Sequence, residues 1–371
     1  AAAITVNNTD GTCTANITNN LSNRNKVKNG AMFISQRGTQ ETGINDSYTG
    51  YRAGPDLFRI DGSSFGTHTV SKSTDSPNGF ANSLKVDCTT ANTSLSAGSL
   101  FEFVHKFEGQ DLQDFAKGTS DAKQFALSFN VKSTKTGTYV VLVLDHDNSR
   151  MVAKTYTVSD TNWNRYEIIF PADTTGAFDN DNAASLSIKF VLVAGTTYNT
   201  GSLQTTWGST SNGGSRTGQV NFADSTSNEW YLTGVQLEVS DYCTSFEHRS
   251  FGQELSLVQR YYWRWTAGAS NRYLWQGQSY STTSCFGVIK EFPVTMRAVP
   301  TSSLSGTFIP YGDDGSTSGH NQFTTRHIDQ NTVHSLATGG WDGGSGIGGG
   351  GRCVVVVATG ATDYIDASAE L

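Results

Sequence analysis

The chain has 371 residues, of which 36% are hydrophobic and only 16% are charged, with 39 glycines and 6 prolines. Low charge, many β-branched residues and frequent glycine turns favour an all-β protein over a helical one. The formal net charge is −7 and the sequence has no basic patch, which argues against a nucleic-acid partner; no apolar run approaches the roughly 20 residues needed for membrane insertion.

The N-terminal residues 1–29 are polar and rich in Asn and Thr, and only residues 3–6 have the pattern of a strand. Such a stretch is disordered alone or ordered by a partner, so we expect an arm that attaches to a neighbouring protein. The strong turn signal Asn29-Gly30 opens the ordered body, and an alternating strand is predicted to follow it up to Gly38.

Predicted strands separated by polar turns fill the middle of the chain. The clearest ones cover residues 84–88, 101–107, 125–131, 138–144, 166–170 and 186–193. No βαβ rhythm connects them, so the pattern is typical of an antiparallel β-sandwich. A Gly, Ser and Thr-rich insert from Gly195 to Gly218 interrupts the pattern, and loops of this length are usually functional or contact another chain.

A junction over residues 230–263 divides the ordered body. Large or β-branched residues occupy every second position from Tyr231 to Val239, which predicts a strand with one buried face. Ser250 stands three residues before Gln253, the spacing of a capping box, so a short helix is predicted from there. The sequence therefore predicts an arm over residues 1–29, a β-sandwich over 30–250, and a smaller C-terminal β domain over 251–371 that opens with this helix.

The same junction carries a family resemblance. Gly234 to Glu238, Phe246 to Ser250 and Gln259 to Tyr262 resemble a junction found in virion structural proteins of tailed bacteriophages, notably tail-fibre-like proteins of marine phages. Asn29 to Gly38 and Phe292 to Thr301 resemble further segments of the same family. The resemblance implies a jelly-roll sandwich like those of carbohydrate-binding modules, a location on the virion, a homotrimer, an N-terminal arm bound to other virion proteins, and attachment to a host-surface glycan.

Aromatic residues are the best candidates for contacts, since 7 tryptophans and 14 tyrosines are many for so polar a protein. Aromatic rings stack on sugar faces, and they also anchor subunit interfaces. We expect ligand contact from three rings in loops: Tyr198, Trp207 and Trp341. We expect an aromatic run on the short helix to form the oligomer interface: Tyr261, Tyr262, Trp263 and Trp265.

Two acidic loops offer oxygen ligands for calcium, one at Asp145 to Asn148 and one that contains the carboxylates Asp173, Asp179 and Asp181. Asp and Asn also favour solvated turns on their own, so both interpretations stay open and no metal site is predicted. Gly62 to Gly66 matches G-x-S-x-G and Gly346 to Gly351 matches GxGxxG, but neither lies in the predicted strand-to-helix context that these motifs need. Five cysteines without a CxxC pair indicate reduced thiols, and no cofactor or catalytic residue is predicted.

Three functions follow from these observations. The favoured one is a non-enzymatic virion protein, a tail fibre or surface appendage that attaches to a host glycan through many weak contacts on repeated copies. The alternative is a decoration or connector protein of the capsid or tail, with the N-terminal arm as its anchor. The third is a glycan depolymerase, which needs a cleft with two carboxyl groups about 5 to 10 Å apart.

Overall fold

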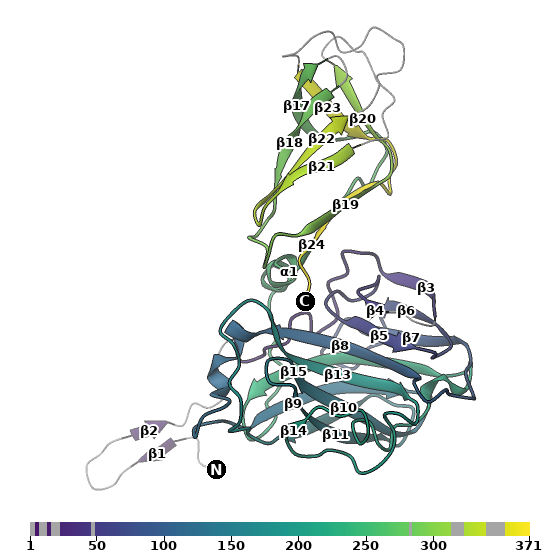
Figure 1. The fold of residues 1–371 in the computed structure, drawn as a ribbon, viewed down its shortest axis with the longest axis vertical. Helices are drawn as coiled ribbons and strands as arrows, with labels where there is room; N and C mark the ends of the chain where they lie inside the picture. Colours follow the sequence, from purple (N-terminus) through teal and green to yellow (C-terminus); the bar gives the residue numbers. More distant parts are fainter. Residues whose placement is uncertain are drawn as a thin grey trace.

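The computed structural model describes residues 4–6, 13–15, 23–45, 49–281, 284–312, 323–338 and 353–371. Figure 1 shows a large β-sandwich with a smaller C-terminal β domain standing on it. All described strand pairs are antiparallel. The predicted all-β class is therefore confirmed.

The sandwich consists of two sheets. The seven-stranded sheet has the order β14 (Gly208–Ser209), β11 (Arg150–Val158), β10 (Gly137–Asp145), β13 (Ala184–Ala194), β8 (Leu100–Glu108), β5 (Arg59–Ser63) and β4 (Thr49–Gly50). The six-stranded sheet has the order β12 (Asn164–Phe170), β9 (Phe125–Ser133), β15 (Glu229–Val239), β7 (Ser83–Thr90), β6 (Thr67–Ser73) and β3 (Gln40–Ile44). The chain crosses repeatedly from one sheet to the other, as a jelly roll does.

Aromatic rings from both sheets meet in the core of the sandwich. Trp230 on β15 is fully buried, and its ring lies 6.1 Å from the ring of Phe103 on β8 and 6.4 Å from that of Phe190 on β13. Phe129 on β9 also contacts Phe190 edge-on at 5.1 Å. The six strands predicted most clearly from the sequence all lie in this sandwich, where each contributes apolar residues to the shared core.

The stretch from Asn25 to Asn29 belongs to the packed body and not to a free arm. Val27 is fully buried, and the amide of Lys26 donates to the carbonyl of Leu237 on β15. The strand predicted after Asn29 is instead an irregular turn, in which the Asn29 side chain bonds both the amide and the carbonyl of Ile34. Gly30 is required there, because a Cβ atom would lie 2.2 Å from the carbonyl oxygen of Val235.

Strand β15 departs from the simple alternation that its sequence indicates. Its register shifts between Thr233 and Gln236, and Gly234 takes a left-handed φ of 65°. Before this bulge the even-numbered residues Trp230 and Leu232 face the core, and after it the odd-numbered residues Val235 and Leu237 do. The predicted wet face is also wrong, since Gln236 and Glu238 are buried beneath residues 243–247.

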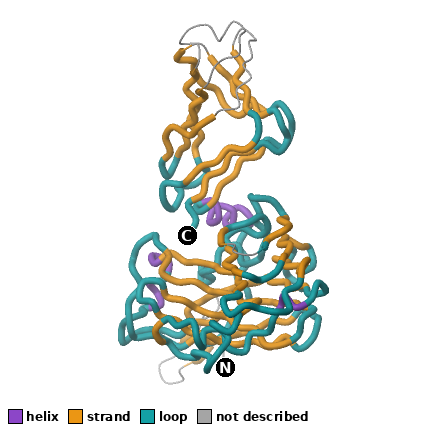
Figure 2. The backbone as a smooth tube through the Cα atoms, turned by 45° about the vertical axis from the view of Figure 1, so that its right-hand side comes forward, coloured by secondary structure: helices purple, strands orange, loops and turns teal. Residues whose placement is uncertain are grey.

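Outside the sandwich, α1 (Phe251–Gln259) lies between the two β parts, as Figure 2 shows. The predicted capping box is confirmed, because the side chains of Ser250 and Gln253 each bond the other's backbone amide. Among the described residues, no helix has the length and apolar character to cross a membrane. Short 3-10 segments of the sandwich are η1 (Gly109–Asp111), η2 (Gln113–Phe115) and η3 (Phe222–Asp224).

The C-terminal domain contains two sheets. One has the order β16 (Tyr262–Thr266), β24 (Tyr364–Ser368) and β19 (Thr301–Ser305). The other has the order β20 (Phe308–Gly312), β23 (Cys353–Ala358), β17 (Arg272–Ser281), β18 (Ser284–Glu291), β22 (Thr332–Thr338) and β21 (Phe323–Ile328). Near the N-terminus, β1 (Ile4–Val6) pairs with β2 (Cys13–Ala15) in a two-stranded sheet of their own.

Polar contacts fasten the C-terminal domain to the sandwich. Glu108, at the end of β8, accepts a hydrogen bond from the hydroxyl of Tyr261 and forms an ion pair of 2.8 Å with Arg260. Further along the joint, Arg37 binds both carboxylate oxygens of Glu370 and stacks 3.4 Å above the ring of Tyr262. The joint is thus closed by residues far apart in sequence.

The carboxyl group of Glu370 makes this joint sensitive to pH. Burial raises the pKa of Glu370 to about 7, despite the opposing effect of Arg37. When an acid has a higher pKa in the folded state than in the unfolded state, the folded protein loses stability as the pH rises from about 4.5 to 7. We therefore expect the free energy of unfolding of the natural protein to fall by about 3 kcal/mol over this range, measured by urea denaturation. The Glu370→Gln variant should not show this decline.

The exposed residue Glu167 provides the control for this experiment, and Glu167→Gln should keep the slope of the natural protein. Burial also raises the pKa of Asp56, and Asp56 shares Arg37 with Glu370, so the difference between the two slopes reports on Glu370 together with its effect on Asp56. Equal slopes for the natural protein and Glu370→Gln would contradict the prediction.

Candidate functional site

An open cleft of about 450 Å³ lies on the outer face of the seven-stranded sheet. Its floor is apolar and is formed by Leu142 and Leu144 of β10 and Met151 of β11, of which Leu144 is partly exposed and the other two are buried. The predicted insert, residues 195–218, crosses this face and supplies the polar rim: Thr210, Ser211, Asn212 and Arg216. Lys189 of β13 completes the wall. The cleft therefore combines an apolar surface with hydroxyl, amide and cationic groups.

A buried carboxylate fixes the insert to the sheet. Glu102 of β8 is fully buried, and its oxygens accept hydrogen bonds from Lys189 at 2.6 Å and from Arg216 at 2.8 and 2.9 Å. Burial by itself would raise the pKa of Glu102, but the two cations outweigh that effect and hold the pKa below its usual value. Glu102 is therefore a permanent anion that holds two cations at the wall of the cleft.

The structure places the three loop aromatics differently. Tyr198 packs on the apolar patch beneath the insert, with the guanidinium of Arg216 5.0 Å from its ring centre. It therefore contacts a residue of the cleft wall without lining the cleft itself. Trp207 closes one end of the sandwich core, where its indole nitrogen donates to the carbonyl of Pro171 at 2.8 Å. Trp341 lies outside the described residues. Ligand contact by these rings stays a prediction.

The two acidic loops meet around a lysine. The ammonium of Lys117 lies 2.6 Å from a carboxylate oxygen of Asp145 and 3.1 Å from one of Asp173, and it also donates to the carbonyls of Thr175 and Gly176. A buried ammonium thus supplies the positive charge that these carboxylates need. In the part of the chain that the structure describes, no group of three or more His, Cys, Asp and Glu side chains could hold a metal ion.

The aromatic run of the junction was predicted on the helix, and this prediction is wrong. Helix α1 ends at Gln259, and the last three rings belong to strand β16. Tyr261, Tyr262 and Trp263 are buried within one chain; for example, the rings of Trp263 and Phe292 pack 5.5 Å apart. Trp265 is partly exposed. The burial of these rings needs no second copy, and the oligomer interface stays a prediction.

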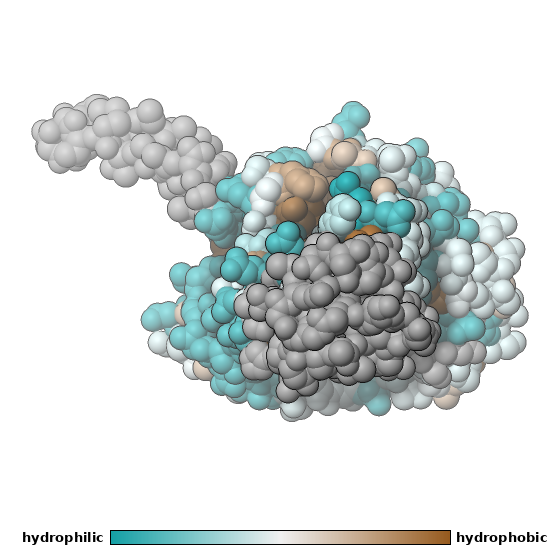
Figure 3. Space-filling view, turned by 90° about the horizontal axis from the view of Figure 1, so that it is seen from above, coloured by the Kyte–Doolittle hydropathy of each residue, from teal (hydrophilic) through white to brown (hydrophobic). Residues whose placement is uncertain are grey.

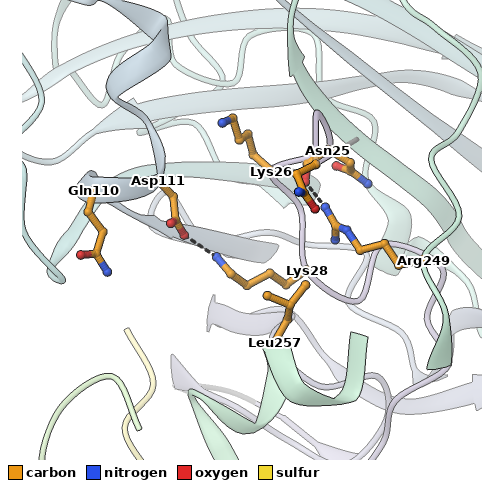
Figure 4. A pocket seen from close by; sticks show the side chains of 8 residues that line it. Asn25, Lys26, Lys28, Gln110, Asp111, Arg249 and Leu257 are labelled. Carbon is orange, nitrogen blue, oxygen red and sulfur yellow. Dashed lines mark hydrogen bonds and ion pairs between the residues drawn. The ribbon is translucent and has the colours of Figure 1, made fainter. Parts of the chain in front are cut away.

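A second hollow lies beside α1, and Figure 4 shows its side chains. Lys28 is paired with Asp111 at 2.8 Å, and Lys26 with Asp114 at 2.9 Å. Arg249 bonds the backbone carbonyls of Asn25 and Val27, and it pairs with Glu254. The charges of this hollow therefore hold the N-terminal stretch against η1 and η2 through its lysines, and against the start of α1 through Arg249. Figure 3 shows that hydrophilic residues cover most of the described surface around the C-terminal domain.

Two glycine motifs of the sequence and two cysteines remain to be placed. The G-x-S-x-G match covers the last two residues of β5 and the turn to β6, so no helix follows it, and the GxGxxG match lies outside the described residues. Cys88 and Cys243 are free thiols, and burial raises the pKa of each to about 11. Sequence reasoning missed Glu102, Lys189 and Arg216 as a set, because no short-range spacing connects them.

No family model and no curated protein matches this chain. Among solved structures, the family 11 carbohydrate-binding module from Clostridium thermocellum, in complex with a β-1,3-1,4-mixed-linked tetrasaccharide, has 13% identity and a TM-score of 0.28, and the match covers 57% of this chain and 99% of that one. A C-terminal family 22 carbohydrate-binding module from Clostridium thermocellum has 11% identity and a TM-score of 0.29, with 57% and 100% covered. Likenesses this distant carry no argument about what this chain binds.

Proposed function

We propose that this chain is a carbohydrate-binding protein whose ligand lies in the cleft on the seven-stranded sheet. The observation that carries the proposal is the combination of an apolar floor with a rim of hydroxyl, amide and cationic groups. A sugar presents both an apolar C–H face and a ring of hydroxyls, so it needs both kinds of surface at once. Because the cleft is open, a long glycan could lie in it and extend beyond both of its ends.

The opposite face of the sandwich supports this choice, because it is already occupied. Residues 243–247 cover one end of the six-stranded sheet. At the other end, Tyr231 lies among Lys85, Lys132 and Glu229, and these groups pair with one another or with Asp75. Each of these charged groups thus already has a partner within the chain.

The charge state of the cleft favours binding over hydrolysis. Glu102 is held ionised by Lys189 and Arg216, and Asp61 pairs with Arg59 at 2.7 Å. A glycosidase needs one carboxyl group with a raised pKa as its general acid, whereas the pKa of Glu102 is lowered. We therefore propose a non-enzymatic role.

The family resemblance of the junction extends the proposal to a biological setting. We propose a virion protein of a tailed phage, a tail fibre or surface appendage that forms a homotrimer and binds a host-surface glycan. Electron cryo-microscopy of the intact particle tests this extension by the position and copy number of the chain. A few trimers on the tail would support it, many copies on the capsid would favour a decoration protein, and absence from the particle would overturn it.

Removal of two rim side chains tests the proposed site directly. In the Ser211→Ala, Asn212→Ala double variant we expect about tenfold weaker binding to the glycans that the natural protein retains on a glycan array, because two hydrogen-bonding groups are lost. The backbone contact of Asn212 with Ser215 remains, so the loop should keep its shape. Affinity is measured by isothermal titration calorimetry.

The matched control carries the same two changes in an exposed turn outside the cleft, Ser159→Ala with Asn162→Ala. This control should bind as the natural protein does. A folded natural protein that retains no glycan, or a double variant in the cleft with unchanged affinity, would overturn the proposed function or its site.

A further inference from the structure

Lys106 of β8 is a cation without a partner. In the described structure its ammonium group makes no hydrogen bond and no ion pair, although it is only partly exposed. Fully buried cations are almost always paired, and Lys106 is half-buried, so its charge remains open to an incoming group. The charged side chains around Lys106 make this more unusual, because most of them are also positive.

The strand register places Lys106 on the same outer face as the cleft. Lys106 pairs with Ser187 of β13, which pairs in turn with Leu144 on the cleft floor. Two strand spacings, roughly 10 Å, therefore separate the backbone of Lys106 from the floor. The imidazole of His146 lies 3.1 Å from the hydroxyl of Ser187, between these two positions. Lys106 thus lies beside the cleft on the same face, beyond the residues that line it.

Cations outnumber carboxylates on this face. Two carboxylates, Asp61 and Glu102, meet four cationic side chains: Arg59, Lys106, Lys189 and Arg216. Burial is the main cause that lowers the pKa of Lys106, and the charges of Arg59, Lys189 and Arg297 add to it, while the charge of Asp61 opposes it. This local excess stands in a chain with a net charge of −7. An incoming anion would relieve the repulsion.

We infer that the ligand of the cleft is an anionic polysaccharide, and that Lys106 binds one of its carboxylate or sulfate groups while the sugar rings lie on the apolar floor. This inference rests on the proposed function, since it specifies the class of glycan for the same cleft. Arg59 and Lys189 are already committed to Asp61 and Glu102, so Lys106 is the cation that is left for a ligand.

Matched pairs of polymers test the inference with the full chain. Polygalacturonate is compared with its fully methyl-esterified form, and dextran sulfate with dextran, by titration calorimetry at low and high salt. We expect binding to at least one charged polymer, at least tenfold weaker binding to its neutral counterpart, and a loss of affinity with salt. The first pair reports on carboxylates and the second on sulfate esters.

Variants of Lys106 assign the effect to this residue. Lys106→Gln should weaken binding of the charged polymer about tenfold, and Lys106→Arg should stay within about threefold of the natural protein, because it keeps the charge. The exposed Lys123 lies outside the cleft, and Lys123→Gln should change nothing. If Lys106 binds a ligand and does not stabilise the fold, the Lys106→Gln variant should have an unchanged or higher Tm.

The outcomes separate this inference from the proposed function. Equal affinity for charged and neutral polymers would overturn the anionic ligand and leave carbohydrate binding in place. Binding of charged polymers that is unaffected by Lys106→Gln would overturn the role of Lys106. Binding of none of the four polymers, together with a silent glycan array, would overturn both.

Discussion

The Trp230→Ala variant is expected to lose about 3 to 5 kcal/mol of the free energy of unfolding, measured by urea denaturation. Trp230 is fully buried on β15 of the six-stranded sheet and faces Phe103 and Phe190 of the other sheet. Truncation removes the ring that fills the space between the sheets. A large cavity would remain, because the strands on both sides are fixed by hydrogen bonds and cannot close it.

Trp163 is the matched control, because it is a partly exposed tryptophan of the same sandwich. It donates a hydrogen bond of 2.9 Å to Asp75 and touches the edge of Tyr231, so Trp163→Ala should cost less than about 1 kcal/mol. Similar losses for the two variants would show that Trp230 does not fill the centre of the core.

Glu102→Gln is expected to destabilise the sandwich by about 3 to 4 kcal/mol, although glutamine has nearly the same shape. The change leaves Lys189 and Arg216 at a buried position without the anion that compensates them; only Asp61, 3.6 Å from the ammonium of Lys189, remains nearby. Since Arg216 ties the insert to the sheet, hydrogen exchange of residues 195–218 should also accelerate. Denaturation and exchange mass spectrometry measure the two effects.

The pair of Lys85 and Glu229 provides the comparison for this variant. Its ammonium and carboxylate lie 2.6 Å apart, but their side chains are 25% and 34% exposed, so water screens the charges. Glu229→Gln should therefore cost at most about 1 kcal/mol. If Glu102→Gln lowers the free energy of unfolding no more than Glu229→Gln does, the prediction is wrong, and Lys189 and Arg216 do not depend on Glu102 for compensation of their charge.

Local patterns were sufficient to predict much of the fold. The strand from Phe125 to Val131 alternates cleanly because one of its faces packs on the core along its whole length. The start of α1 is predictable because the capping box needs only Ser250 and Gln253. The buried face of strand β15 was predicted correctly after the bulge, at Val235 and Leu237, but wrongly before it, since the bulge at Gly234 depends on the rest of the molecule.

The site could be predicted only in outline. The glycine-rich insert was singled out and its residues line the cleft, but the residues that form the wall come from distant parts of the chain: Glu102 and Arg216 are 114 positions apart. The same holds for Lys117, which joins Asp145 and Asp173 of two separate acidic loops. No local spacing marks such pairs, because tertiary structure alone brings them together.

The pairing of β16 with β24 has a consequence during synthesis on the ribosome. Tyr262 to Thr266 leave the ribosome directly after α1, but their partner strand, Tyr364 to Ser368, follows only about 100 residues later. At typical elongation speeds this gap lasts roughly 5 to 20 seconds. The sandwich can fold in that time, whereas the aromatic strand β16 remains unpaired, so a nascent chain stalled before residue 364 should be a good substrate for chaperones.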